Sequence, residues 1–243
     1  MNAYPYDLHI HSCLSPCGDD DMTPNNLVGM AALSGCQVIA ITDHNTCKNA
    51  GAVMEAGREA GLLVVPGMEL CTAEEAHVVC LFETLEGAMA FDQYVWENMP
   101  HIPNRPEIFG EQRLMDSQDR QTGLLEDLLL VSSFLGVDQV PEIAARYGGV
   151  AFPAHVNRDS YSVLASLGTI PPEAGFTAAE VTRDCDLEAL EKTCPQLKDL
   201  KILRSSDSHY LETLATGEPL SIHLPELSCR AVVEAIRQGK GRG

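Results

Sequence analysis

Two histidines near the start of the chain have the spacing of ligands to one metal ion. They lie in the segment DLHIHS, residues 7–12, directly after the stretch Tyr4-Pro5-Tyr6. Side chains two residues apart in a β-strand point to the same face, so His9 and His11 would be directed at a single point. Six of the eight histidines in the chain lie in segments of this kind, which makes a metal site the leading hypothesis.

Four apolar runs further along the chain are each followed by histidine or carboxylate residues. The residues that follow these four runs are Asp43 with His44, Glu69, His155, and Asp207 with His209. In parallel α/β folds the functional site assembles beyond the carboxyl ends of the strands, so we expect these side chains to share one rim. His77 departs from the rule, because it begins its run (VVCLF follows it) and reaches the rim only if the chain dips there.

Each of these residues also has an ordinary structural interpretation. A single histidine at a strand end is more often a hydrogen-bonded structural residue, and Glu69 could be a loop carboxylate. A whole cluster of imidazoles and carboxylates facing one point would nevertheless be unfavourable without a cation, because of repulsion and lost solvation. Histidine combined with carboxylate, without paired cysteines, suits zinc, iron or manganese.

The elements that must position these residues follow a strand–helix repeat. We predict strands at residues 37–42, 62–65, 78–82, 149–152, 178–182, 201–204 and 220–224. We predict helices from Thr23-Pro24 to Gly35 and at residues 48–60, 85–98, 138–147, 186–193 and 228–238. Repeated units of this kind imply a parallel sheet with helices outside, and about seven of them favour a barrel over an open sheet.

An irregular segment at residues 98–123 interrupts the repeat. It contains three prolines within residues 98–106 and shows no helical period. A loop this long inside a compact domain is usually functional or disordered. A lid over the site, a contact in an oligomer, and a peripheral excursion packed on the barrel are the alternatives.

The composition disfavours several classes of protein. A net charge of −19 argues against non-specific nucleic-acid binding, which depends on basic patches, although metal ions could still attract a small anionic substrate. No apolar run reaches the roughly 18 residues of a membrane span, and the N-terminus lacks the pattern of a secretory signal. Nine cysteines without a framework predict reduced thiols. We therefore expect a cytoplasmic protein with no membrane partner.

The ordered segments DLHIHS, ITDHN, GMEL, AHVVCLF, PAHV and SDSH resemble the polymerase and histidinol phosphatase (PHP) family. The resemblance runs from Asp7 to His209, most of the chain. It implies an α/β fold, a distorted (β/α)7 barrel, here as a single domain over residues 1–243 with an irregular insertion at 98–123. It also implies a metal-dependent phosphoesterase with two or three divalent ions that hydrolyses a phosphate ester by metal-activated water.

Carried over residue by residue, the resemblance implies three metal positions. The implied ligands are His9, His11, Glu69 and Asp207 for the first metal, Glu69, His77 and His155 for the second, and His44, His209 and a residue of the loop after His11 for the third. Asp43 would orient an imidazole instead of binding a metal.

The loop after His11 departs from the family pattern. Many relatives read His-Ser-x-x-Ser-Asp-Gly, with the aspartate as a ligand, whereas here Ser15 is followed by Pro16-Cys17-Gly18-Asp19-Asp20-Asp21. Counting back from Thr23-Pro24 places Asp19 at the ligand position, with a three-residue insertion before it. Cys17 and Asp20 are the alternatives.

A substrate phosphate requires a basic group near the metals. Arg158 lies three residues after His155 and is the candidate clamp, with Arg183 and Lys48 as less favoured choices. The other candidate catalytic residues are Glu69, Asp207 and His209. We expect a small phosphorylated substrate, a nucleotide- or histidinol-phosphate-like monoester, and no long nucleic acid. The alternatives are a phosphodiesterase or nuclease acting on short oligonucleotides, and a metal-binding regulatory module without turnover.

Overall fold

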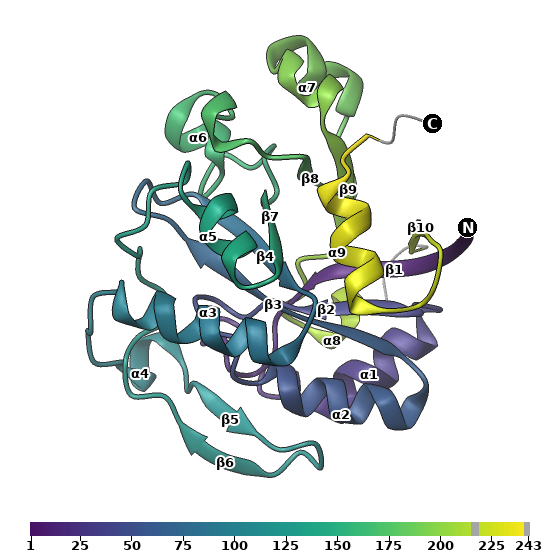
Figure 1. Ribbon diagram of the computed structural model, residues 1–243. Helices are drawn as coiled ribbons and strands as arrows, with labels where there is room; N and C mark the ends of the chain where they lie inside the picture. The colour runs from purple at the N-terminus through teal and green to yellow at the C-terminus, as the bar shows by residue number, and fades with distance from the viewer. Residues whose placement is uncertain (215–218, 241–243) are drawn as a thin grey trace.

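The computed structural model describes residues 1–214 and 219–240 and contains a strongly curled β-sheet with helices around it (Figure 1). In this part of the chain six strands form one sheet in the order β10-β1-β2-β3-β4-β7, while β8 and β9 form a separate pair. The strands of the large sheet are β1 (Asn2–Ile10), β2 (Val38–Ile41), β3 (Leu63–Cys71), β4 (His77–Phe82), β7 (Gly149–Pro153) and β10 (Leu220–Leu224). The parallel pair is β8 (Ala178–Thr182) with β9 (Lys201–Ser205).

The β8–β9 pair lies between β7 and β1, without a continuous ladder on either side. Beyond β7, the amide of Val156 donates to the carbonyl of Glu180 in β8 at 2.8 Å. On the other side, the amide of His11 donates to the carbonyl of Ser208 at 3.0 Å, just beyond β9. The strands therefore curl into an interrupted half-barrel, which confirms the predicted α/β fold and its distortion.

The direction of β4 differs from the all-parallel arrangement that the repeat predicts. β4 pairs antiparallel with β3 and with β7, and Cys71 lies opposite His77 in the first of these pairs. The connection between β3 and β4 spans only residues 72–76, whereas a parallel crossover needs about a dozen residues. Because β4 begins where β3 ends, His77 lies at the same rim as the residues that follow the parallel strands.

The predicted helices are present, with ends within a few residues of those expected. They are α1 (Pro24–Leu33), α2 (Ala50–Ala60), α3 (Leu85–Glu97), α5 (Val140–Arg146), α7 (Leu187–Thr193) and α9 (Cys229–Arg237). Two short helices, α6 (Val163–Leu167) and α8 (Leu211–Leu214), were not predicted. Val232 and Ile236 of α9 pack in one buried cluster with Leu8 and Phe152, so this helix closes part of the core. No helix in the described ranges is long and apolar enough to span a bilayer.

The irregular segment has more structure than its sequence predicts. It contains α4 (Pro106–Phe109) and a hairpin of β5 (Arg113–Met115) and β6 (Gln121–Leu124), which lie below α3 in Figure 1. The side chain of Asn49 accepts from the amide of Met115 and donates to the carbonyl of Arg113, both at 3.0 Å. The segment is therefore held against the loops that carry the candidate site residues.

Candidate metal centre

Glu69 lies at the centre of a buried cluster of histidines at the rim of the sheet. Strand β3 extends over residues 63–71 and places the side chain of Glu69 inside the open end of the half-barrel. Glu69 is 1% exposed there. Its Oε1 lies 2.9 Å from Nδ1 of His77 and 3.1 Å from Nε2 of His155. Its Oε2 lies 3.1 Å from Nδ1 of His44 and 3.2 Å from Nε2 of His11. One carboxylate thus contacts side chains from four other chain segments.

Three groups of side chains in this cluster have the arrangement of metal ligands. In each group the candidate ligand atoms lie within 4.8 Å of one another. The groups are His9, His11, Glu69 and Asp207; His44, Glu69 and His77; and His11, His44 and His209. The first group has the same members as the first ligand set expected from the sequence. The other two share members with the expected sets, and His155 contacts Glu69 at the edge of the second.

The separations between the donor atoms fit a bound divalent ion. Nε2 of His9 lies 3.3 Å from Nε2 of His11 and 3.2 Å from Oε1 of Glu69. Oδ1 of Asp207 lies 3.3 Å from Nε2 of His9 and 3.1 Å from Nε2 of His11. Atoms bound about 2.1 Å from a tetrahedral ion are roughly 3.4 Å apart. Buried nitrogen and oxygen donors at these distances are consistent with a multi-metal site.

Hydrogen bonds through serine and aspartate orient His11. Nδ1 of His11 lies 3.0 Å from Oγ of Ser15, which in turn donates to Oδ1 of Asp43 at 2.7 Å. Ser12 donates to the same carboxylate from its amide and its hydroxyl, each at 2.7 Å. A neutral His11 with Nδ1 donating into this network has its Nε2 lone pair available for a metal. Asp43 therefore acts on the ring of His11 through Ser15, without contacting it.

Glu180 orients His9 and was missed by the sequence reasoning. Its Oε1 lies 2.9 Å from Nδ1 of His9 and accepts from the amide of His155 at 3.1 Å, while the residue is 2% exposed. Among the described residues its Oε2 has no hydrogen-bond partner. The available signal was a glutamate inside the apolar strand AAEVT, since carboxylates are almost never fully buried unless they are paired.

Burial and neighbouring charges set the protonation of the cluster. Burial would raise the pKa of Glu69, but the surrounding imidazoles, His77 first, together hold it well below its usual range. Burial, with the charge of His11, lowers the pKa of His44 to about 4 and that of His209 to about 3. Near neutral pH these two imidazoles are therefore neutral, which is the form that binds a metal.

Backbone strain concentrates at this rim. Asn45, His155, Tyr161 and Asp207 have φ angles of 53°, 29°, 53° and 51°, in the left-handed region that non-glycine residues rarely adopt. Such residues cost about 1–3 kcal/mol each and cluster at functional sites. The strain supports the view that the arrangement of these side chains is functional.

Asp19, expected as a ligand of the third metal, does not join the cluster. Its side chain is exposed, and its Oδ1 accepts from the amide of Asp21 at 2.9 Å, while its amide donates to the carbonyl of His209 at 2.8 Å. Asp20 pairs with Arg113 at 2.7 Å. Cys17 lines the cavity above the cluster but belongs to none of the three ligand groups. In the described chain, the third group therefore consists of imidazoles alone.

The three basic candidates occupy different positions. Arg158 is nearest to the cluster, because its Nη1 lies 2.7 Å from Oδ2 of Asp207 and its side chain is 45% exposed toward the cavity. Arg183 pairs with the buried Asp7 at 2.7 Å. Lys48 pairs with the buried Asp92 at 2.8 Å and does not line the cavity above the cluster. Of the three, Arg158 is the one that contacts Asp207, a member of the first ligand group.

A cavity of about 620 Å³ opens above the histidine cluster. Its floor includes Glu69 and Asp207, and one wall is apolar, with Ile102, Leu130 and Tyr161 exposed to the cavity. The ring of Tyr161 stacks on that of His77 at a centroid distance of 5.0 Å. We call this space the metal cavity. It combines a polar floor with an apolar wall, as ligand sites commonly do.

Curated relatives match only part of the chain. A protein of uncharacterized function from Methanocaldococcus jannaschii is 36% identical over 84 residues, which are 31% of this chain and 48% of that protein. A 5′-3′ exoribonuclease from Haemophilus influenzae is 35% identical over 79 residues, 31% of this chain and 28% of the enzyme. The matches thus span less than half the length of these relatives.

Solved structures of the same fold match nearly the whole chain. The lesion-specific endonuclease EndoQ from Pyrococcus furiosus has a TM-score of 0.70 and 16% identity, over 99% of this chain and 57% of the endonuclease. A Bifidobacterium adolescentis protein described as a metal-dependent phosphoesterase has a TM-score of 0.59 and 17% identity, over 99% of this chain and 98% of that protein. At such identities the likeness establishes the fold.

The model of the PHP domain matches residues 7–133, slightly more than half of the 243 residues. The matched segment contains Glu69 and four histidines of the ligand groups, His9, His11, His44 and His77. The ligand-like groups and the half-barrel that surrounds them agree with this match. The chain belongs to the PHP domain family.

Proposed function

We propose that this protein is a metal-dependent phosphoesterase that hydrolyses a small phosphate monoester, such as a nucleotide- or histidinol-phosphate-like compound. The observation that carries the proposal is the contact of Glu69 with five histidines at the floor of an open cavity. A single carboxylate that reaches two ligand groups at once can hold two ions close together, which is the arrangement used for phosphate ester hydrolysis.

The roles of the residues follow from their positions. His9, His11, Glu69 and Asp207 would hold one ion, Glu69 with His77 and His155 a second, and His44 with His209 a third. When bound, divalent ions supply an activated water and neutralise charge on the phosphoryl oxygens. Arg158 would contact a phosphoryl oxygen from the side of Asp207, and His209 faces the cavity where the ester would lie. The apolar wall formed by Ile102, Leu130 and Tyr161 would receive the organic group of the ester.

A second candidate is hydrolysis of a diester in a short oligonucleotide. The relatives of this chain include an exoribonuclease and an endonuclease, which supports this candidate. The net charge of −19 argues against long nucleic acid, since contacts with many phosphates require basic patches. A binding module without turnover is the least supported alternative, because the ligand groups are nearly complete.

A panel of phosphate esters tests the proposal directly. Protein loaded separately with zinc, iron or manganese would be assayed on nucleoside monophosphates, histidinol phosphate and bis-p-nitrophenyl phosphate. We expect turnover of a monoester that disappears on chelation and in Glu69→Gln. Faster turnover of the diester would favour the second candidate. Full metal loading without hydrolysis of any ester would refute the phosphoesterase proposal.

Arg158→Ala tests the proposed phosphate contact. Loss of a charge-assisted hydrogen bond should cost about 1.5–3 kcal/mol, roughly ten- to hundredfold in kcat/KM on the best ester. Metal content should not change, because Arg158 contacts Asp207 only through the oxygen that lies away from the histidines. Arg105→Ala is the matched control, since Arg105 is an exposed arginine paired with Glu107 outside the cavity. Equal kcat/KM values for the two variants would show that Arg158 does not contact the substrate phosphate.

A further inference from the structure

A second cavity adjoins the metal cavity, and the proposed function does not use it. It has a volume of about 400 Å³, within the range of about 300–1,000 Å³ typical of ligand sites. Asn45, Pro100 and Leu129 line both cavities, so these three residues lie between the two spaces. A ligand long enough to pass them from the metal centre would reach the second space, which we call the Trp96 cavity.

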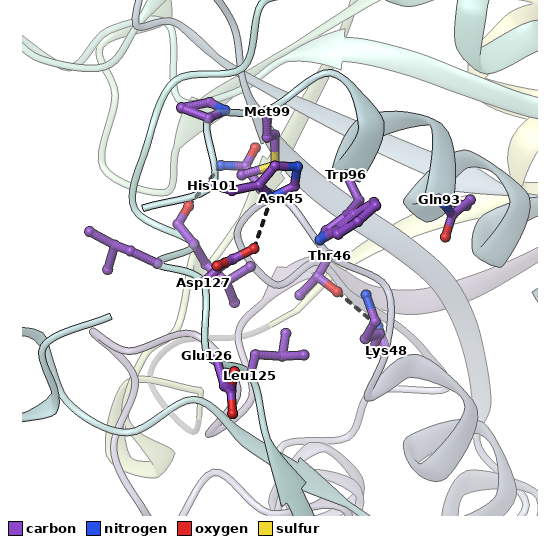
Figure 2. A pocket seen from close by; sticks show the side chains of 13 residues that line it. Asn45, Thr46, Lys48, Gln93, Trp96, Met99, His101, Leu125, Glu126 and Asp127 are labelled. Carbon is purple, nitrogen blue, oxygen red and sulfur yellow. Dashed lines mark hydrogen bonds and ion pairs between the residues drawn. The ribbon is translucent and has the colours of Figure 1, made fainter. Parts of the chain in front are cut away.

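The Trp96 cavity has a flat apolar wall. Trp96, from the last turn of α3, is 46% exposed and is the single tryptophan of the chain. Its ring lies 4.5 Å from that of His101, measured between centroids, and Figure 2 shows the two rings close together. Met99 and Leu128 line the same space. A half-exposed indole that lines a cavity can stack against another planar ring.

The charges around the Trp96 cavity argue against an anion. Lys48, which lines it, is already paired with the buried Asp92 at 2.8 Å. Glu126 and Asp127 add two carboxylates, and Asp127 pairs with His101 at 2.8 Å, as the dashed line in Figure 2 shows. Phosphate binding calls for a surplus of basic groups. The cavity is suited to an uncharged planar group whose edge can bond to polar side chains, and Gln93 and Glu126 offer such contacts.

We propose that the Trp96 cavity is a subsite for a second nucleobase, so that the protein binds a short oligonucleotide of at least two bases, the second candidate above, more tightly than a mononucleotide. This inference rests on the proposed function, since it places the reacting phosphate at the metal centre. One nucleoside lies against the apolar wall of the metal cavity, and the next base stacks on Trp96. The negative phosphates stay near the metals, and only the base enters the Trp96 cavity.

Binding of 2-aminopurine nucleotides tests the subsite, because the fluorescence of this base falls when it stacks. The probes are the 5′-phosphorylated dinucleotide with 2-aminopurine as its second base, and 2-aminopurine riboside 5′-monophosphate. Each is mixed rapidly with metal-loaded protein, and the initial quenching gives a Kd before turnover. Stacking of one base on an aromatic ring contributes enough that Trp96→Leu should weaken dinucleotide binding by about five- to hundredfold. The Kd of Trp96→Leu for the mononucleotide should stay within about twofold of the value for the unaltered protein.

Two further variants make the result specific to the ring of Trp96. Trp96→Phe keeps an aromatic face and should recover most of the dinucleotide affinity. Phe134→Leu removes an aromatic residue that is 67% exposed and lines neither cavity, so it should bind both probes like the unaltered protein. Since Trp96 is half-exposed, its replacement should leave the fold intact, which circular dichroism would verify.

The outcomes separate the inference from the proposed function. Equal Kd values for Trp96→Leu and the unaltered protein, or an equal loss for both probes, would overturn the subsite. Quenching of the dinucleotide that depends on Trp96, without hydrolysis of any ester, would uphold the subsite as a binding site and refute the phosphoesterase proposal. Hydrolysis of monoesters, together with the same dinucleotide Kd for Trp96→Leu and the unaltered protein, would refute the subsite alone.

Discussion

Replacing Glu180 by glutamine removes one charge from beside the candidate metal ligands and nearly preserves the side-chain volume. Oε1 of Glu180 accepts from Nδ1 of His9 at 2.9 Å, and Nε2 of His9 faces Glu69 and Asp207 at 3.2 and 3.3 Å. The carboxylate thus fixes the ring that would donate its other nitrogen to an ion. Such partners of metal-binding histidines typically affect metal affinity by about 10–100-fold.

The expected magnitude for Glu180→Gln follows from that range. A 10–100-fold weaker affinity is about 1.4–2.7 kcal/mol at the first metal position. Folding stability should also fall, because the amide nitrogen would lie where Oε2 now has no partner in the described structure. A buried unsatisfied donor costs about 1–3 kcal/mol. The variant should therefore lose both metal affinity and thermal stability.

Competition with a chelator would measure the affinity, and calorimetry would measure the midpoint of unfolding. Asp92→Asn is the matched control, because Asp92 is 3% exposed and accepts from Thr46 at 2.6 Å and from Lys48 at 2.8 Å, away from the cluster. Asp92→Asn should lower the unfolding midpoint with metal affinity preserved. If Glu180→Gln behaves like Asp92→Asn in both measurements, Glu180 has a packing role only and the reasoning fails.

Three other changes probe separate parts of the structure. Glu69→Ala should lower the metal content by at least two ions per chain, because Glu69 belongs to two ligand groups, and unchanged elemental analysis would contradict this. Asp19→Asn should leave the metal content unchanged, because the exposed Asp19 side chain accepts from the amide of Asp21 and belongs to no ligand group. Loss of metal in Asp19→Asn would assign the third position to Asp19, and loss in Cys17→Ala would assign it to Cys17. Burial raises the pKa of Tyr6 from 10.0 to about 12, so the unfolded chain ionises first and stability falls by up to about 2.7 kcal/mol between these pH values. Urea unfolding of Tyr6→Phe should lose that part of the alkaline dependence, and parallel pH profiles for both proteins would count against it.

Most of the strands and helices could be predicted because their apolar periodicity is strong. The runs 37–42 and 178–182 form β2 and β8, and the Thr23-Pro24 pair marks the start of α1. The convergence of His9 and His11 follows from the two-residue period of a strand alone. These elements are determined by interactions between residues close together in the sequence, so each could be predicted from its own segment.

The features that escaped prediction depend on contacts between distant segments. The orientation of β4 is set by the short connection at residues 72–76, and the antiparallel pairing then brings His77 to the rim. Glu180 is more than 170 residues from His9 along the chain, yet it lies 2.9 Å from its ring. The side chain of Asp19 depends on how the loop after β1 folds between Met22 and His209. A one-residue uncertainty in register there changes which residue faces the cavity.

The irregular segment at residues 98–123 shows both kinds of feature, those set by the local sequence and those set by contacts between distant segments. Its prolines exclude a long helix, but their positions do not predict where the chain returns to the barrel. It returns through Leu129 and Val131, whose carbonyls both accept from the side chain of Asn45 at 2.8 Å, one residue after His44. The same return places Leu129 between the metal cavity and the Trp96 cavity. The part of the chain that departs from the barrel repeat therefore shapes the space above a ligand cluster built by the barrel itself. We expect substitutions at Ile102 and Leu130 to change which esters bind, with metal content preserved, because these side chains line the metal cavity without belonging to any ligand group.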